Sequence, residues 1–213
     1  MAALLLLTLA WAGLAAAPAP AQQAPVKIVA FGDSLTAGYG LPAEAAFPAR
    51  LAAALKAKGH AVEIANAGVS GDTASGGLAR LDWSVPEGTD AVILELGAND
   101  LLRGIDPKVT AKALDAILAK LTARRIKVML CGMLAGKNMG ADYEAAYNAM
   151  FPALAKAHNV LFYPFFLDGV ATDRALNLQD GLHPNAEGVD IIVKGILPKV
   201  EELIAQVQAA RAS

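Results

Sequence analysis

Three residue types that together perform nucleophilic catalysis stand at two distant places in the chain. Ser34 lies in FGDSLT (residues 31–36), directly after an apolar run, and His183 lies near the other end with Asp180 three residues before it. A serine hydroxyl needs a base within hydrogen-bonding reach, because it ionises too weakly at neutral pH to attack an ester or amide. A carboxylate at the Asp180 spacing can bind the other imidazole nitrogen and stabilise the imidazolium. These residues predict a serine hydrolase.

Each of these features also has a purely structural interpretation. Gly-Asp-Ser is an ordinary turn followed by a helix cap, and an Asp near a histidine is often only a solvated loop residue. The other histidines, His60 and His158, lie in polar helix-to-strand connections and are predicted to be surface residues. Asp33 is a rival partner for His183, although its adjacency to Ser34 favours a hydrogen bond within the turn.

Hydrolysis by a serine also needs donors for the oxyanion of the tetrahedral intermediate. Gly71 follows the second predicted strand in NAGVSGDT (residues 66–73), and Asn99 follows the third in GAND (residues 97–100). The Gly71 N–H and the Asn99 amide are candidate donors, although each stretch alone is typical of a turn. Both stretches and Ser34 follow predicted parallel strands at their carboxyl ends, the edge where open α/β folds bind ligands.

The elements that position these residues follow from the alternation of short apolar runs with helical patterns, which is typical of βαβ units. The chain has 213 residues, of which 55% are hydrophobic and 18% charged, enough for one domain with a substantial core. The runs are apolar on successive residues, as in strands that helices cover on both faces. We predict an α/β fold with five parallel strands, at residues 26–31, 61–65, 91–96, 127–131 and 160–163.

Helical patterns fall between and after these strands. Asp72 and Asp106 are candidate N-caps, and Pro107 suits a first helical position. The last helix carries apolar residues at three- and four-residue spacing, which predicts a face packed on the sheet. The predicted helices are residues 47–57, 72–81, 107–123, 142–157 and 186–209.

Charge and cysteine content narrow the classes of function. The formal net charge is −2 and no Lys/Arg cluster interleaves with aromatic residues, so nucleic acid is not expected as a partner. Cys131 is the only cysteine, so an intramolecular disulfide is ruled out. Its place at the end of an apolar run predicts a buried side chain rather than a reactive thiol.

Residues 1–21 have the composition of an export signal. The leucine run Leu4–Leu7 lies in an apolar stretch that ends near Pro18, and Ala19-Pro20-Ala21 suits a signal peptidase, although no Lys or Arg precedes the run. The stretch is shorter than the about 20 residues of a membrane span, so a stable membrane anchor is the weaker interpretation. We therefore predict a cleaved signal peptide (1–21) and a single periplasmic or secreted domain (22–213).

Sequence motifs of other enzyme classes are absent or do not fit their required structural context. The dinucleotide-like pattern in GYGLPA (residues 38–43) begins several residues beyond the strand and contains a proline. No Gly-x-Ser-x-Gly surrounds Ser34, which excludes the nucleophile elbow of α/β-hydrolases. The sequence has neither a His-Glu-x-x-His motif nor a P-loop.

Four blocks follow one another in the order GDSL (32–35), the glycine block ending at Gly71, GAND (97–100) and DGLH (180–183). Together they span almost the whole predicted mature chain, which therefore resembles the GDSL, or SGNH, hydrolase superfamily. Longer stretches are similar to its exported thioesterase I, lysophospholipase and arylesterase branch, namely residues 32–39, 70–73, 77–81, 95–97 and 164–166.

The resemblance assigns roles residue by residue. It implies Ser34 as nucleophile, His183 as base and Asp180 as the carboxylate that orients the base. It also implies an oxyanion hole made of the Ser34 and Gly71 N–H groups and the Asn99 amide. The family's three-layer α/β/α fold with a five-stranded parallel, flavodoxin-like sheet agrees with the predicted elements. No metal or organic cofactor is implied.

Substrate specificity is expected from loops after the third, fourth and fifth strands. Residues 101–105 and 133–140 mix apolar side chains with glycines, a composition that can line an acyl-chain groove or simply pack on the domain. Phe165 and Phe166 are predicted to be core residues rather than groove residues. The candidate substrate-binding residues are Leu101, Leu102, Ile105, Leu134 and Met139.

The hypothesis is hydrolysis of small-molecule or lipid-derived acyl esters or thioesters through an acyl-Ser34 intermediate. One alternative is a carbohydrate O-deacetylase on the same scaffold. Another is a non-catalytic protein that binds acyl chains or lipids and keeps a relic site. An activated serine hydroxyl distinguishes both enzymes from the binding protein.

Overall fold

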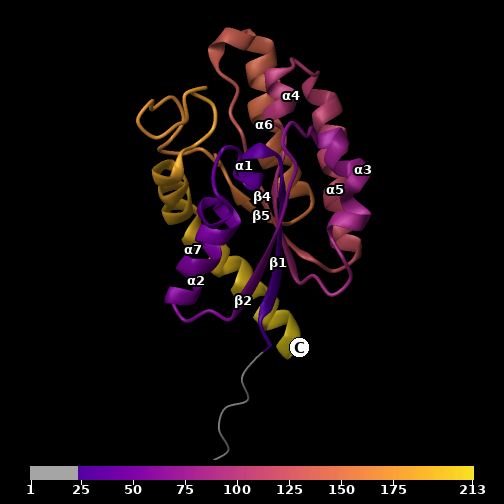
Figure 1. Ribbon diagram of the computed structural model, residues 1–213. Helices are drawn as coiled ribbons and strands as arrows, with labels where there is room; N and C mark the ends of the chain where they lie inside the picture. Colours follow the sequence, from indigo (N-terminus) through magenta and orange to yellow (C-terminus); the bar gives the residue numbers. More distant parts are fainter. Residues whose placement is uncertain (1–23) are drawn as a thin grey trace, which may run out of the picture.

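The computed structural model describes residues 24–213, and a five-stranded parallel sheet runs through its centre (Figure 1). The strand order is β2-β1-β3-β4-β5, so the order reverses between β1 and β3, the place where open α/β sheets form a ligand crevice. The predicted five-stranded parallel sheet is therefore confirmed. The strands are β1 (Val26–Gly32), β2 (Val62–Gly68), β3 (Ala91–Glu95), β4 (Lys127–Cys131) and β5 (Leu161–Tyr163).

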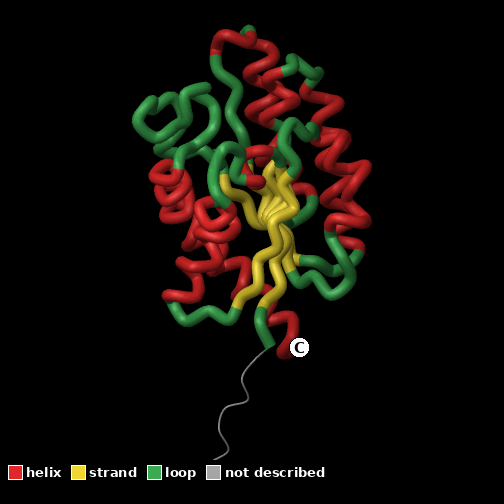
Figure 2. Tube along the Cα trace, viewed as in Figure 1, coloured by secondary structure: helices red, strands yellow, loops and turns green. Residues whose placement is uncertain are grey.

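Helices cover both faces of this sheet and give three layers (Figures 1 and 2). On one face α2 (Phe47–Ala57) packs beside α7 (Ala186–Ala212). On the other face α5 (Pro107–Ala123) lies between α3 (Ala74–Ser84) and α6 (Ala141–Ala157). Four short elements complete the described part of the chain: α1 (Ser34–Ala37), α4 (Ala98–Leu102) and the 3₁₀ helices η1 (Ala43–Ala45) and η2 (Lys137–Met139).

The core lies between the sheet and each helical layer. Every residue of β3 is buried, as a central strand covered on both faces requires. Phe47 of α2 meets Phe166 edge to face at 5.0 Å between ring centroids, and Tyr147 meets Phe151 in α6 at 5.4 Å. The predicted apolar stripe of the last helix is buried at Val189, Ile192, Val193, Ile196 and Val200, while Leu197 is only partly buried.

Several predicted boundaries differ from the structure by one to three residues, and two of these differences lie beside the candidate site. Strand β2 continues to Gly68, because its backbone keeps pairing with β1 up to Gly32 although the sequence has already turned polar. The helix after it starts at Ala74, and its cap is Thr73, whose hydroxyl accepts the Gly76 N–H at 3.1 Å. Asp72 is therefore not the cap.

Several further predictions concern single residues or the N-terminal segment. Cys131 is buried, 1% exposed, as predicted. None of the helices between residues 24 and 213 has both the length and the apolar character needed to cross a membrane. The predicted signal peptide (1–21) lies outside the described residues, and the domain bounds 22–213 stay a prediction.

Candidate active site

Ser34 lies where the sheet order reverses, at the carboxyl end of β1. It is the first residue of α1, and the preceding Asp33 caps that helix by accepting the Leu35 N–H at 3.0 Å. Asn99 lies in α4, directly after β3, the neighbour of β1. The fold therefore brings two of the predicted site residues to one edge of the sheet.

His183 reaches this edge from the loop that precedes α7. Its Nε2 lies 2.9 Å from the Ser34 Oγ, across 149 positions of sequence, and its Nδ1 lies 2.6 Å from the Asp180 Oδ2. With a proton on Nδ1 facing the carboxylate, Nε2 is free to accept the proton of the serine hydroxyl. The arrangement can therefore activate the hydroxyl as a nucleophile.

The other carboxylate oxygen of Asp180 holds the loop itself. Oδ1 accepts the N–H groups of Leu182 and His183, at 2.9 and 3.0 Å. Hydrogen bonds to the charged form favour ionisation, and these bonds, with that from the His183 backbone foremost, lower the pKa of Asp180 to about 2. Asp180 therefore stays negative across the pH range in which an imidazole titrates.

The predicted oxyanion donors lie in three separate segments: Ser34 in α1, Gly71 in the turn after β2 and Asn99 in α4. Within residues 24–213 the N–H groups of Ser34 and Gly71 donate to no protein acceptor, so both can bind a ligand. Gly71 has a φ of 82°, a left-handed conformation that glycine adopts without strain, and its carbonyl accepts the Arg103 guanidinium at 2.6 Å. The Asn99 Nδ2 donates one hydrogen to Asp33 at 2.9 Å, which leaves its second hydrogen for another acceptor.

A buried carboxyl group lies beneath this edge. Glu95, at the end of β3, is fully buried and accepts the Thr36 hydroxyl at 2.8 Å and the Asp33 N–H at 3.3 Å through Oε2. Its Oε1 has no partner within the described chain. Burial, reinforced by the charge of Asp33, raises the pKa of Glu95 well above its ordinary value, and burial also raises the pKa of Asp33 to about 6.

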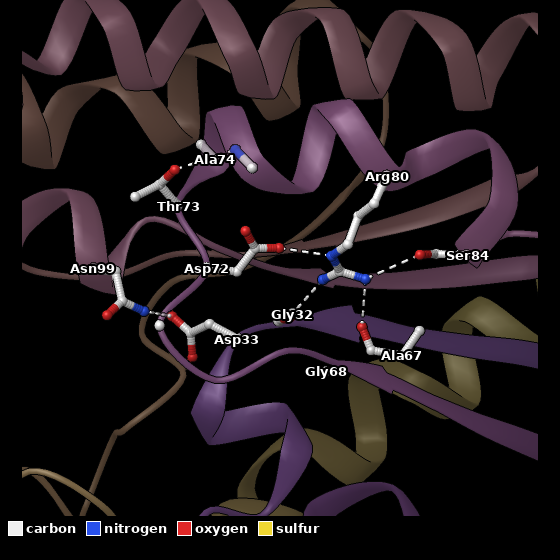
Figure 3. Close-up of polar contacts among 12 residues, drawn as sticks. Gly32, Asp33, Ala67, Gly68, Asp72, Thr73, Ala74, Arg80, Ser84 and Asn99 are labelled. Atoms are coloured by element: carbon white, nitrogen blue, oxygen red, sulfur yellow. Dashed lines mark hydrogen bonds and ion pairs between the residues drawn. The ribbon is translucent and has the colours of Figure 1, made fainter.

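Arg80 of α3 ties the ends of β1 and β2 together (Figure 3). Its guanidinium pairs with Asp72 at 2.6 Å and donates to the carbonyls of Gly32 and Ala67 at 2.8 and 2.9 Å. It also lies 4.1 Å from the centroid of the Phe31 ring. These contacts hold the turns that carry Ser34 and Gly71, and they explain why Asp72 does not cap the helix.

An apolar cavity of about 220 Å³ opens beside Ser34 and His183. Three of the five predicted substrate-binding residues line it: Leu101, Leu102 and Leu134. Ile105 and Met139 are not among its lining residues. The others that form it are Leu35, Ala98, Asn99, Met133, Phe165, Leu167, Ala171 and Leu182.

Sequence reasoning missed several of these lining residues. Phe166 is a core residue as predicted, 1% exposed, whereas Phe165 lines the cavity. Leu182, between Asp180 and His183, is half exposed although it is large and apolar. Its place inside the histidine block was the signal that could have found it.

The remaining histidines stand away from this cavity. His60 lies 2.9 Å from Glu201, and His158 lies 2.6 Å from Asp115, in helix-to-strand connections at the amino edge of the sheet. Both side chains are partly buried in these pairs rather than fully exposed. Among residues 24–213, no group of three or more His, Cys, Asp or Glu side chains is placed to hold a metal ion.

One family of known proteins matches most of the chain. Residues 30–191 match the GDSL-like Lipase/Acylhydrolase family. The chain belongs to this family. It is 37% identical over 187 residues to an arylesterase of Vibrio mimicus, a match that covers 87% of this chain and 90% of the relative.

Further similarity within the family extends to both sequence and structure. The chain is 35% identical to thioesterase 1/protease 1/lysophospholipase L1 of Escherichia coli K12, over 83% of this chain and 84% of that protein. The solved structure of AlinE4, an SGNH-hydrolase family esterase, superposes with a TM-score of 0.72 at 40% identity. That match covers 85% of this chain and 97% of AlinE4, so the SGNH hydrolase fold extends over most of the chain.

Proposed function

We propose that the protein is a serine hydrolase that cleaves acyl esters or acyl thioesters through an acyl-Ser34 intermediate. The observation that carries the proposal is the continuous chain of contacts from Ser34 Oγ to His183 Nε2 and from His183 Nδ1 to Asp180, at 2.9 and 2.6 Å. A lone serine or a lone Asp–His pair has many structural uses. Their alignment beside an apolar cavity is what acyl transfer requires.

In the first half-reaction Ser34 Oγ attacks the carbonyl carbon while His183 Nε2 takes the hydroxyl proton. The carbonyl oxygen becomes an oxyanion, for which the Ser34 and Gly71 N–H groups and the second Asn99 amide hydrogen are the proposed donors. Asp180 stabilises the imidazolium. The imidazolium then gives its proton to the leaving alcohol or thiol as the bond from the carbonyl carbon to that group breaks.

In the second half-reaction water replaces the leaving group. His183 removes a proton from the water, the resulting nucleophile attacks the acyl-Ser34 carbonyl, and the same donors bind the oxyanion. Collapse of this intermediate returns the proton to Ser34 Oγ and releases a carboxylic acid. The steps balance without a metal or an organic cofactor.

The acyl chain is proposed to occupy the cavity beside Ser34. Leu101, Leu102 and Leu134 are among its lining residues, and apolar side chains dominate the rest. Such a cavity favours an acyl chain of more than two carbons over an acetyl group, because each added methylene buries more apolar surface. This favours esters and thioesters of moderate chain length over the deacetylase alternative.

The direct test of the proposed nucleophile is Ser34→Ala. We expect hydrolysis of p-nitrophenyl acyl esters to fall at least about 10³-fold, with the far-UV circular dichroism and melting temperature kept. Ser75→Ala, a change at an exposed serine of α3, is the matched control and should retain wild-type turnover. Full activity of the Ser34→Ala variant would exclude the proposed function.

A fluorophosphonate probe separates catalysis from mere binding. An activated Ser34 becomes covalently labelled, whereas an acyl-binding protein with a relic site does not react. Parallel assays on acetylated oligosaccharides and on p-nitrophenyl esters and acyl-CoA thioesters of graded length then distinguish a deacetylase from an acyl ester hydrolase. Activity confined to the acetylated sugars would favour the deacetylase.

We also propose that the enzyme is exported after cleavage of residues 1–21. The leucine run Leu4–Leu7 and the small residues at 19–21 support this proposal. N-terminal sequencing of protein recovered from the periplasm or the medium should begin near Gln22. Recovery of the uncleaved chain in the cytoplasm would contradict it.

A further inference from the structure

A tyrosine ring lies directly against the imidazole of His183. The ring centroids of Tyr39 and His183 are 4.4 Å apart and their planes are inclined by 35°. Tyr39 is nevertheless 51% exposed, so this contact is not a by-product of burial in the core. Packing in the core therefore does not explain why a large aromatic side chain lies at this position.

The backbone fixes both partners of this contact. The Ser34 carbonyl accepts the N–H groups of Gly38 and Tyr39, each at 3.1 Å, so the turn that carries the nucleophile also carries the ring. On the other side the His183 carbonyl accepts the Leu178 N–H at 2.7 Å. Two segments that are far apart in sequence therefore each hold one of the two rings in place.

Asp180 and Ser34 contact His183 at its two ring nitrogens, whereas Tyr39 lies against the ring itself. The Asp180 carboxylate lies in contact with Nδ1, and the nearby Asp33 carboxylate interacts with His183 through its charge. Ser34 occupies Nε2. The π face of an aromatic ring attracts a cation within about 6 Å of its centroid, so Tyr39 interacts more favourably with imidazolium than with neutral imidazole.

We propose that Tyr39 is a positioning residue for His183, whose ring holds the imidazole toward Ser34 and stabilises the imidazolium that forms during attack. This inference rests on the proposed function, since it needs His183 to act as the base. It assigns to a half-exposed residue a part in the chemical step rather than in substrate binding. The phenol hydroxyl has no part in it.

The test compares Tyr39→Leu with Tyr39→Phe. Leucine keeps an apolar side chain but removes the π face, and we expect kcat to fall roughly 5- to 30-fold with KM within about twofold. Phenylalanine keeps the face and should stay within about twofold of wild type. The combination of a lower kcat, an unchanged KM and rescue by phenylalanine is what a π face acting in the chemical step predicts.

Each other outcome overturns the inference. A leucine variant with wild-type kcat, a phenylalanine variant as slow as the leucine variant, or a change confined to KM would mean that the π face of Tyr39 does not act in the chemical step. If either variant lacks the wild-type circular dichroism, Tyr39→Met and the rate of fluorophosphonate labelling of Ser34 replace it. Wild-type protein that neither turns over esters nor labels would instead refute the proposed function itself.

Discussion

Asn99 shows how one side chain can serve a carboxylate and a substrate together. One of its amide hydrogens is bound by Asp33 at 2.9 Å, which fixes the direction of the other hydrogen. Asp33 is not the partner of His183, since Asp180 holds the imidazole. The Asp33 carboxylate instead caps α1 and orients Asn99, which agrees with the structural role predicted for it.

Replacing Asn99 with alanine should therefore remove an oxyanion donor. We expect kcat to fall about 10²- to 10³-fold with little change in KM, because the lost interaction is made mainly in the transition state. Steady-state kinetics on a p-nitrophenyl ester measure this. Asn138→Ala, at an exposed position, is the control. Equal kcat in the two variants would mean that Asn99 does not bind the oxyanion.

Glu95 gives a prediction about stability rather than rate. Its pKa lies well above the ordinary 4.5, because burial disfavours its charged form. As the pH rises above 4.5 the unfolded chain loses a proton that the folded chain keeps, so wild type loses about 1.4 kcal/mol of stability per pH unit from this group. The glutamine of Glu95→Gln does not titrate. The stability of this variant relative to wild type should therefore increase with pH until Glu95 ionises in the folded wild-type protein.

Chemical denaturation between pH 4 and pH 8 measures this difference. Glu63→Gln, an exposed change on β2, should show no comparable trend. Glu95→Ala should cost about 3 kcal/mol even at low pH, because it leaves a cavity and deprives the Thr36 hydroxyl of its acceptor. A stability difference between Glu95→Gln and wild type that stays constant with pH would mean that Glu95 is ionised in the folded protein.

At the scale of elements, Arg80 connects α3 with the ends of two strands. Its partner Asp72 is only 12% exposed, so removal of the guanidinium leaves a largely buried carboxylate without its cation and takes a donor from the carbonyls of Gly32 and Ala67. We expect Arg80→Met to lose about 3 to 5 kcal/mol in chemical denaturation. Arg80→Lys should lose less, because the ammonium keeps the charge but cannot reach all the acceptors.

Arg174→Met is the matched control, since Arg174 is exposed, and it should stay within about 0.5 kcal/mol of wild type. If Arg80→Met were equally mild, the turns that carry Ser34 and Gly71 would not depend on this contact for their stability.

The regular elements were largely predictable from the sequence. Helices α2 and α5 and strand β4 begin and end where the pattern predicts, because their apolar residues repeat clearly and Asp106 with Pro107 starts α5. Helices α1 and α4 were not predicted. Each is shorter than two turns, which is too short for the sequence to show a helical period. Helix α1 also depends on its N-cap Asp33, and the sequence around Asp33 is equally typical of a turn.

Long-range polar contacts were the least predictable part of the site. The nucleophile, base and carboxylate could be found because their blocks are local motifs. Glu95 contacts Thr36, and Arg80 contacts two strand-end carbonyls. Neither set of contacts produces a local pattern in the sequence. A glutamate inside the otherwise apolar run of β3 was the one available signal.

At the scale of the whole molecule, the cavity is assembled from segments, two of them short helices, that follow four strands of the sheet. Leu35 follows β1, Leu101 follows β3, Met133 follows β4 and Ala171 follows β5. Parallel strands bring these loops to one edge, which is why the edge could be predicted. Which side chains face the cavity depends on the backbone conformation of these segments. For this reason the prediction that Ile105 and Met139 line the cavity was wrong.

Ala171→Leu should narrow this cavity and change the preferred acyl chain. We expect kcat/KM for octanoyl esters to fall about tenfold or more while acetyl esters are nearly unaffected, because the added side chain occupies space that the longer chain needs. Ala210→Leu places the same change on the exposed end of α7 and should leave the ratio unchanged. An unaltered octanoyl-to-acetyl ratio in Ala171→Leu would place the acyl chain elsewhere.

The acyl-enzyme itself offers the most direct test of the central claim. The enzyme is mixed with excess p-nitrophenyl acyl ester, quenched with acid within milliseconds, and digested for mass spectrometry. The account predicts one acyl group on the peptide that contains Ser34, at a level that falls as substrate is exhausted, and none in the Ser34→Ala variant. Turnover without any acylated Ser34, or with the acyl group on another residue, would contradict it.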